Sequence, residues 1–292
     1  MNYIEHKSVL KRMKKRLVWN KVWKSVFLVA VLIALLSLVV LVVRIVTQGI
    51  GYLTWDFLTN FASRIPSNAG IKAALVGSLY LMLVVAPVSI VLGVSTAIYL
   101  EEYAKKNKLN DFIRMNISNL AGVPSIVFGL LGLTIFVRLF DLGKSILAAG
   151  LTMSLLVLPI IIVAAQEAIR AVPNEQREAS FGMGATKWQT IIRVVLPTAL
   201  PGILTGSILA LSRAIGETAP LVVIGIPVIL QFLPESLLST FTALPMQIYE
   251  WAKRANPEFQ YVAAAGIMVL MTVLIIMNSV AIFIRNKFQK RY

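Results

Sequence analysis

About six blocks of apolar residues, each about twenty residues or longer, divide this sequence. A helix that rises 1.5 Å per residue needs about twenty residues to cross some 30 Å of hydrocarbon. Each block therefore predicts a membrane-spanning helix, and together they predict an all-α bundle. The expected spans are residues 25–46, 71–99, 117–137, 145–168, 198–229 with a break around 216–220, and 261–284.

Composition agrees with a membrane protein and excludes an ordinary soluble domain. Hydrophobic residues make up 58% of the chain and charged residues 14%, against roughly 25% charged in soluble proteins. The formal net charge of +15 could indicate nucleic acid as a partner if the basic residues formed one patch. They lie instead in short segments between the apolar blocks, where Lys and Arg hold loops at the cytoplasmic face and meet anionic lipid.

The distribution of Lys and Arg predicts the topology. The N-terminal tail holds eight of them, the connections 101–116 and 169–197 four each, and the C-terminal tail four, whereas the alternate loops together hold seven. Because cytoplasmic loops are enriched in Lys and Arg, both termini are expected in the cytoplasm of a prokaryotic cell, with the chain multi-pass in its cytoplasmic membrane. The predicted parts are a basic tail (1–24), a first span with its outer loop (25–70), a core (71–284) that includes the cytoplasmic connection 169–197, and a basic tail (285–292).

The residue inventory excludes several classes of active site. The chain has no cysteine and a single histidine, His6 in the basic tail, so thiolate metal sites and Ser-His-Asp triads cannot be built from it. We expect no catalytic residue and no metal ligand. No segment reads G-x-x-x-x-G-K-[ST], the phosphate-binding loop of ATPases, so any ATP hydrolysis is expected from another chain.

The connection 169–197 carries the most specific local pattern. Pro173 and Asn174 favour a helix start, and Gly182 and Gly184 permit a sharp turn before a second short helix. Such a helix-turn-helix beyond the membrane can dock on a soluble partner and pass its motion to the spans on either side. The alternative is an amphipathic loop lying in the lipid headgroups. The residues that form the pattern are Glu178, Ala179, Ser180, Gly184, Val194, Leu196 and Pro197.

One basic residue, Arg213, falls inside the fifth predicted span. Arginine at mid-membrane costs about 2.5 to 3.5 kcal/mol on insertion scales and usually faces a bundle interior or a wet cavity. Glu217 lies four residues further along and shares its helix face. A guanidinium suits a tetrahedral oxyanion because its donors are planar and bidentate. The alternative is an Arg-Glu pair that only fixes helix packing.

Several of these segments resemble a known family. The pattern in 169–197 is similar to the EAA loop of ABC importer permeases, with Ser180 and Val194 as its two departures. Residues 122–130 and 213–221 look like the hallmark runs of phosphate permeases. Residues 244–249 and 258–260 resemble the A subunit of such importers, the PstA family, more than its C partner.

The resemblance implies the fold of a type I ABC importer permease and a role in phosphate import. It implies a heterodimer with a second, PstC-like permease and an extracytoplasmic PstS-like phosphate-binding protein. It also implies two PstB-like subunits, docked at the 169–197 loop, which themselves bind ATP and Mg. No cofactor is then expected on this chain, and Arg213, Glu217 and Thr218 would line the phosphate route. The alternatives are a permease for another oxyanion such as molybdate or sulfate, an ion-coupled secondary carrier, and a membrane-embedded enzyme.

Overall fold

The computed structural model describes residues 6–105 and 107–288, so the outermost parts of the two predicted tails, 1–5 and 289–292, lie outside the described residues. Within those ranges the regular elements are helices, which agrees with the predicted all-α class. They are α1 (His6–Gly49), η1 (Ile50–Tyr52), α2 (Trp55–Thr59), η2 (Pro66–Asn68), α3 (Lys72–Ile98), η3 (Tyr99–Tyr103), α4 (Lys108–Leu120), α5 (Ser125–Gly132), η4 (Leu133–Leu139), α6 (Ile146–Arg170), α7 (Asn174–Gly182), α8 (Lys187–Thr190), η5 (Ile191–Val195), α9 (Leu196–Gly216), α10 (Ala219–Ile224), α11 (Leu244–Lys253) and α12 (Glu258–Phe288).

Membrane-spanning helices account for most of the fold. Five helices of the described chain are long and apolar enough to cross a bilayer, and a bent pair of helices brings the number to as many as six. This confirms the prediction of about six spans. The predicted basic tail is helical from His6 onward and continues into the first span as α1, because its Lys, Arg, Leu and Met residues favour helix and no Gly or Pro interrupts them.

The central helix of the bundle is α6, which packs between α3 and α9. Of its most apolar stretch, 67% is buried. Small residues bring the three helices close together: a Cβ on Gly150 of α6 would lie 2.6 Å from Val84 of α3, and one on Gly206 of α9 would lie 2.3 Å from Ala164 of α6. Close van der Waals packing is the main source of helix association in lipid, where apolar burial gives little drive.

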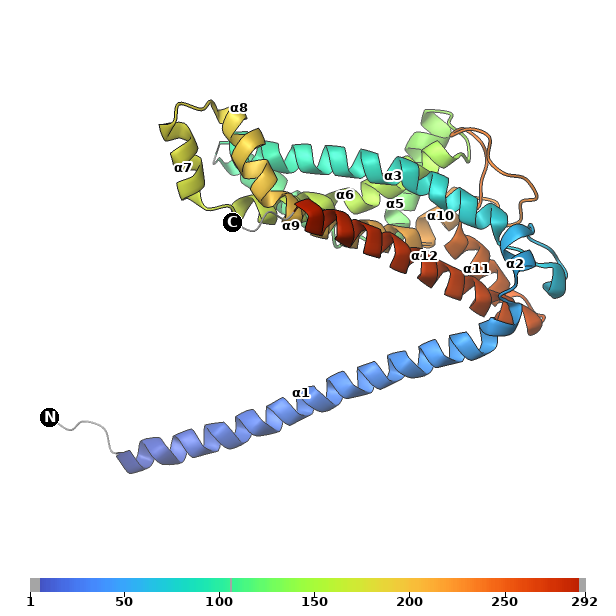
Figure 1. Ribbon diagram of the computed structural model, residues 1–292, viewed down its shortest axis with the longest axis horizontal. Helices are drawn as coiled ribbons and strands as arrows, with labels where there is room; N and C mark the ends of the chain where they lie inside the picture. The colour runs from blue at the N-terminus through green and yellow to red at the C-terminus, as the bar shows by residue number, and fades with distance from the viewer. Residues whose placement is uncertain (1–5, 106, 289–292) are drawn as a thin grey trace.

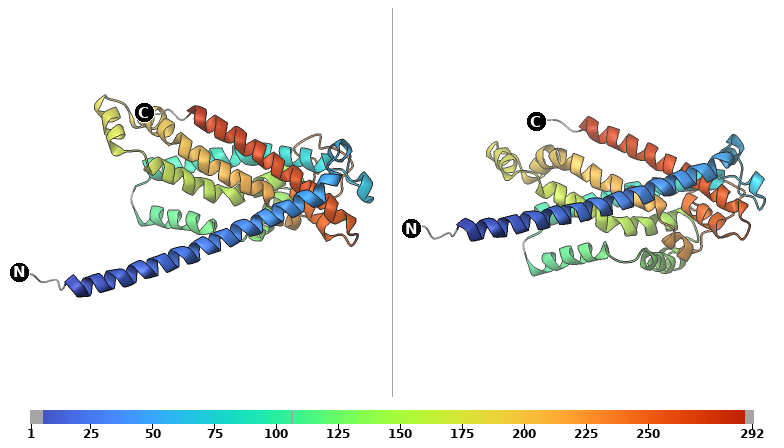
Figure 2. Two further views of the ribbon diagram at one scale, coloured as in Figure 1. Left: turned by 60° about the horizontal axis from the view of Figure 1, so that its bottom comes forward. Right: turned by 90° about the horizontal axis from the view of Figure 1, so that it is seen from below.

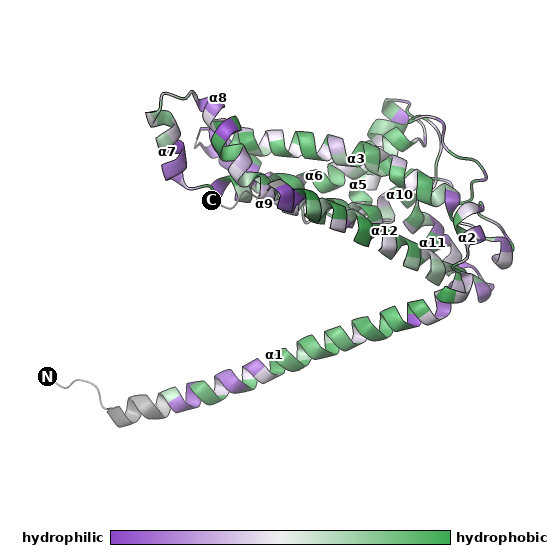
Figure 3. Ribbon diagram, in the orientation of Figure 1, coloured by the Kyte–Doolittle hydropathy of each residue, from purple (hydrophilic) through white to green (hydrophobic). Residues whose placement is uncertain are grey.

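The first helix lies at an angle to the rest of the molecule (Figures 1 and 2). It meets α12 near its C-terminal end, where a Cβ on Gly49 would lie 2.7 Å from the backbone of Ala264 and Ala265. The most apolar stretch of α1 is 0% buried. Its long apolar half is therefore left for lipid or another protein (Figure 3).

Both predicted cytoplasmic ends lie at one end of the molecule. The start of α1, the end of α12 and the connection formed by α7 and α8 are found there (Figure 1). Polar residues concentrate in α7, α8 and the start of α1 (Figure 3). The arrangement agrees with an even number of crossings.

The third predicted span, residues 117–137, is wrong as a single helix. The chain forms α4 up to Leu120 and then α5 with η4 from Ser125, and the two helical segments meet at 103°. Pro124 precedes α5 in an extended conformation with ψ of 136°. Proline removes a helical hydrogen bond and forces the preceding residue out of the helical region, so a helix cannot run through this point unbroken.

The fifth span also differs from its predicted bounds. It does not begin near residue 198, because α8, η5 and α9 run on as one helical segment, Lys187–Gly216. A π-helical turn, η5 (Ile191–Val195), precedes Pro197 in this segment. A π-turn is a rare form that often marks functional positions inside helices. The second helix of the cytoplasmic connection is therefore the beginning of a spanning helix.

Candidate functional site

The two runs that resemble phosphate permeases, residues 122–130 and 213–221, are packed together. Helix α5 carries Gly129 and helix α10 carries Pro220, and a Cβ on Gly129 would lie 2.8 Å from the Cα of Pro220. Only a glycine allows the two backbones to approach this closely. Two sequence segments about ninety residues apart thus form one structural unit at the end of α9.

Arg213 and Glu217 form the ion pair that their spacing predicts. Arg213 Nε lies 3.2 Å from Glu217 Oε1. The Arg213 side chain is 55% exposed and that of Glu217 19%. Helix α9 ends at Gly216, and Glu217 follows it in extended backbone. The carboxylate therefore leaves part of the guanidinium accessible.

Arg213 lies on the exposed face of α9. Leu209, one turn earlier, is 67% exposed, and Gly216 is also exposed. On the opposite face Ala210 and Ala214 are buried against the rest of the bundle. Thr218, the third predicted route residue, is half-buried and immediately precedes α10. The structure thus pairs Arg213 with Glu217, and Thr218 follows Glu217 directly in the chain.

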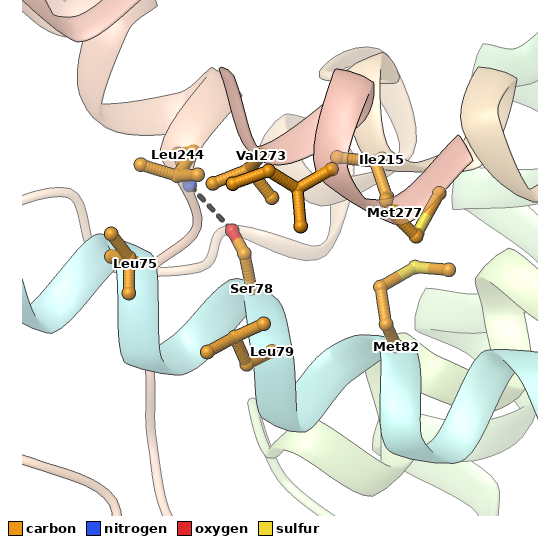
Figure 4. Close-up of a pocket in the computed structure, with 9 residues that line it drawn as sticks. Leu75, Ser78, Leu79, Met82, Ile215, Leu244, Val273 and Met277 are labelled. Atoms are coloured by element: carbon orange, nitrogen blue, oxygen red, sulfur yellow. Dashed lines mark hydrogen bonds between the residues drawn. The ribbon is translucent and has the colours of Figure 1, made fainter. Parts of the chain in front are cut away.

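An apolar cavity of about 240 Å³ lies beside this segment, between α3, α9, α11 and α12 (Figure 4). Ile215 of α9 contributes to its wall, together with Met82 and Met277. The hydroxyl of Ser78 in the lining accepts a hydrogen bond of 2.8 Å from the backbone N–H of Leu244. Its lining gives an anion no charged partner, so the cavity does not extend the Arg213 site.

The cytoplasmic connection forms a second site at the other end of the bundle. Helix α7 begins at Asn174 after Pro173, as the sequence predicts. Gly184 has φ of +81°, a conformation that side chains other than glycine adopt only with strain, so the predicted turn is present. Gly182 is instead the last residue of α7.

Hydroxyl groups hold the two arms of this loop together. Ser180 Oγ and Thr190 Oγ1 lie 2.9 Å apart and are both buried. Thr186 begins α8 through a capping box with Gln189, which satisfies two backbone N–H groups. Glu178 and Ala179 are exposed on α7, whereas Leu196 and Pro197 open α9.

Three large apolar side chains face outward from this loop. Met183 is 84% exposed, Trp188 60% and Phe181 48%. An exposed apolar group of this kind, set among polar residues beyond the spans, is typical of a protein-protein contact.

The profile of one protein family matches residues 89–289, and its description is "Binding-protein-dependent transport system inner membrane component". The match covers more than half of the chain and includes both sites. The chain belongs to this family. It is thus a membrane component of a transport system, multi-pass in the cytoplasmic membrane, and its family works with a substrate-binding protein and an ATPase.

Two named relatives are similar to this transport component over more than half of its length. It is 38% identical over 177 residues to the "Probable ABC transporter permease protein YqgI" of Bacillus subtilis, an alignment that covers 61% of this chain and 60% of that protein, less than two thirds of its length. It is 33% identical over 246 residues to the "Phosphate transport system permease protein PstA" of Yersinia pestis, covering 83% of this chain and 82% of that protein.

Solved structures show the same fold for the transport component. An inward-facing MetNI methionine ABC transporter aligns with a TM-score of 0.62 at 16% identity, covering 75% of this chain and 96% of that chain. A bacterial ABC transporter involved in the import of alginate aligns with a TM-score of 0.57 at 16% identity, covering 96% of this chain and 100% of that chain. The fold is that of a type I ABC importer permease, as expected.

Sequence reasoning on this transport component missed a charged cluster at the inner end of the bundle. It comprises Glu101, Glu102, Arg114, Arg170 and Arg177. Its members come from η3, α4, α6 and α7, and the paired residues Glu102 and Arg177 are 75 residues apart, so no local spacing reveals them. Within residues 6–105 and 107–288, no three His, Asp or Glu side chains group closely enough to hold a metal ion.

Proposed function

We propose that this chain is the PstA-type permease subunit of an ATP-driven importer of inorganic phosphate. The observation that carries the proposal is the Arg213–Glu217 pair on the uncovered face of α9, a helix that begins in the cytoplasmic loop. The relatives named as phosphate transport permeases, one of them 33% identical over 83% of this chain, support the choice of substrate.

Arg213 has the donors that a phosphate ion needs. Within the described residues its Nε is engaged by Glu217, while its two terminal amino groups make no hydrogen bond. A guanidinium binds an oxyanion through parallel N–H donors and stays charged at any physiological pH. Glu217 offsets the charge of Arg213, so the pair offers an anion directed N–H donors without a net positive charge, and the ion is not held too tightly to leave.

The partners follow from the surfaces that the chain leaves open. A second, PstC-like permease would cover the exposed face of α9 and the apolar half of α1. Two PstB-like ATPases, which bind the ATP and Mg, would dock on the loop residues Phe181, Met183 and Trp188, beside Glu178. A PstS-like phosphate-binding protein would deliver phosphate to the opposite end of the bundle. The chain itself then breaks no covalent bond.

The geometry supports a simple coupling mechanism. Closure of the ATPases on ATP moves the docked loop, and because Lys187–Gly216 is one helical segment, the displacement of α8 reaches α9 and Arg213 directly. Rigid-body movement of this kind switches a bundle between inward-facing and outward-facing states. Phosphate released by the binding protein enters when the pathway opens outward.

The test is ATP-dependent uptake of inorganic phosphate by proteoliposomes that contain the chain with its co-purifying subunits. Arg213→Gln is expected to slow uptake by about tenfold or more, since a hydrogen bond to a charged group contributes roughly 1.5 to 3 kcal/mol. Arg16→Gln, which removes an exposed charge at the start of α1, is the matched control and should leave uptake unchanged. Undiminished uptake by Arg213→Gln would remove the anion-contact role.

Two further measurements separate the alternatives. Uptake that continues without ATP would indicate an ion-coupled carrier and overturn the ABC assignment. Competition by equimolar molybdate or sulfate that matches competition by unlabelled phosphate would indicate another oxyanion as the substrate.

A further inference from the structure

Arg177 of α7, in the cytoplasmic loop, makes polar contacts with two other parts of the bundle. Its guanidinium lies against Glu102 of η3, with Nη2 3.1 Å and Nε 3.3 Å from Glu102 Oε1. The same side chain donates to the backbone carbonyls of Ile169, at 2.9 Å, and Val172, at 2.5 Å. One arginine thus joins α7 to the inner ends of both α3 and α6.

The Arg177–Glu102 ion pair, called here the joint, is largely buried and therefore holds α7 firmly. The Arg177 side chain is 17% exposed and that of Glu102 12%. A pair largely removed from water is weakly screened, and the loss of one partner leaves an uncompensated charge. The Ile169 carbonyl also accepts the backbone N–H of Val172 at 3.3 Å, so the guanidinium adds a second partner at the end of α6 and one at the Val172 carbonyl just beyond it. Lysine could not make these contacts together, because it lacks the planar fork of donors.

The neighbouring residue, Glu101, extends the joint to the rest of the bundle. It accepts hydrogen bonds from Arg170, through Nε and Nη2 at 2.9 Å each, and from Gln166 Nε2 at 2.8 Å. It also forms an ion pair with Arg114 of α4. The inner ends of α3, α4 and α6 are therefore held as one unit, to which Arg177 fastens α7.

The two arms of the cytoplasmic loop reach the bundle in different ways. The second arm, α8, is continuous with α9. The first arm, α7, is separated from α6 by the short link 171–173 and cannot transmit a force through a helical backbone. A docked ATPase would move α9 directly, whereas α3 and α6 would follow only through side-chain packing against α9 unless something else fixed α7 to them.

We propose that Arg177 and Glu102 are positioning residues that fix the first arm of the coupling loop to α3 and α6, so that ATP-driven movement of the loop shifts these helices together. The inference rests on the proposed function of the loop as the ATPase contact. Neither residue touches phosphate or ATP. Loss of the pair should therefore separate ATP hydrolysis from transport.

The first test measures phosphate uptake and ATP hydrolysis in the same proteoliposomes, containing the complete complex and the binding protein. Arg177→Gln and Glu102→Gln are each expected to lower the phosphate taken up per ATP hydrolysed by about tenfold, within the 5- to 150-fold range typical of coupling between sites. Hydrolysis itself should stay within about twofold of wild type, since the docking residues are unchanged. Lys105→Gln, three residues from Glu102 and exposed, is the control and should keep the wild-type ratio.

A wild-type ratio in both variants would overturn the inference while leaving the proposed function intact. Absence of ATP-dependent uptake in the wild-type complex would instead reject the proposed function. If a variant fails to assemble with the other subunits, the ratio of uptake to hydrolysis cannot be measured, so a second experiment tests the inference independently.

The second test uses the absence of cysteine from the chain. In the double variant Glu102→Cys, Arg177→Cys, a short bis(methanethiosulfonate) reagent, which forms a disulfide with each cysteine and releases methanesulfinate, can replace the ion pair by a covalent link. The inference predicts poor coupling with free thiols and restored phosphate uptake per ATP after cross-linking. Uptake that falls on cross-linking would show that the joint must open during transport, and the inference would be wrong.

Discussion

Gly129 of α5 lies against Pro220 of α10 so closely that a Cβ on the glycine would stand 2.8 Å from the Cα of the proline, 3.0 Å from Val223 Cβ and 3.1 Å from the carbonyl oxygen of Pro220. Two of these three neighbours are backbone atoms, which cannot move without shifting α10. Helix α10 directly follows Glu217 and Thr218. The contact therefore holds the end of the proposed phosphate route in place.

Substitution of Gly129 by valine is expected to destabilise the permease. Overpacking of a tight contact costs about 1–3 kcal/mol, and here it also displaces the segment that carries Glu217. Thermal unfolding of the purified complex in detergent should show a lower midpoint. Gly122→Val is the matched control, because the nearest atom to its Cβ is Asn119 O at 3.4 Å; an equal loss in both variants would contradict the packing argument.

The shape of the arginine at position 213, and not only its charge, should matter for transport. Arg213→Lys keeps the positive charge but loses the planar donors that bind an oxyanion bidentately. We expect phosphate uptake to fall by about tenfold, the effect of losing one charge-assisted hydrogen bond of roughly 1.5 kcal/mol. Concentration dependence of uptake provides the measurement, and a lysine variant with wild-type kinetics would mean that charge alone suffices.

The sequence alone predicts the features of this molecule that arise from residues close together in the chain. The spans follow from apolar length, and the Arg213–Glu217 pair follows from a separation of four residues in a helix. The turn at Gly184 follows from the lack of a Cβ. The number of spans, the ion pair and the φ of +81° at Gly184 meet these predictions, whereas the third span is broken and the fifth begins earlier than expected.

Relationships between distant segments were beyond such reasoning. Glu102 and Arg177 are 75 residues apart, and nothing in either local sequence specifies the other.

The break at Pro124 interrupts an apolar block that hydropathy alone reads as continuous. The fifth span was expected to begin near residue 198, yet the helical segment runs from Lys187 to Gly216 and contains a π-turn just before Pro197.

Ser78 is expected to stabilise the junction of α3 with the outer segment around α11. Its hydroxyl accepts the backbone N–H of Leu244, which is fully buried. Ser78→Ala leaves that donor without its partner, at a cost of about 1–3 kcal/mol. Thermal unfolding should show the loss. Ser37→Ala on exposed α1, whose hydroxyl bonds within its own helix to Ile33 O, should have little effect, and the same midpoint for the two variants would contradict the prediction.

Two glycines of the cytoplasmic loop, two residues apart, allow a test of the turn that joins its arms. Gly184 has φ of +81°, whereas Gly182 is the last residue of α7 without a positive φ, and a Cβ would meet nothing within 4 Å at either position. The two sites thus differ in backbone conformation and not in the space available. Alanine at 184 must adopt the left-handed conformation at a cost of about 1–2 kcal/mol, while alanine at 182 favours the helix.

Gly184→Ala is therefore expected to distort the turn between α7 and α8 and to reduce ATP-dependent phosphate uptake, with Gly182→Ala close to wild type. The readouts are uptake by proteoliposomes and retention of the ATPase subunits on affinity purification through this chain. Because the strain acts on the loop and not on the spans, the permease itself should remain folded, as judged by its elution from size exclusion. Equal activity of the two alanine variants would mean that the loop tolerates a different turn between α7 and α8. The proposal that this turn transmits the movement of the ATPases to the spans would then be wrong.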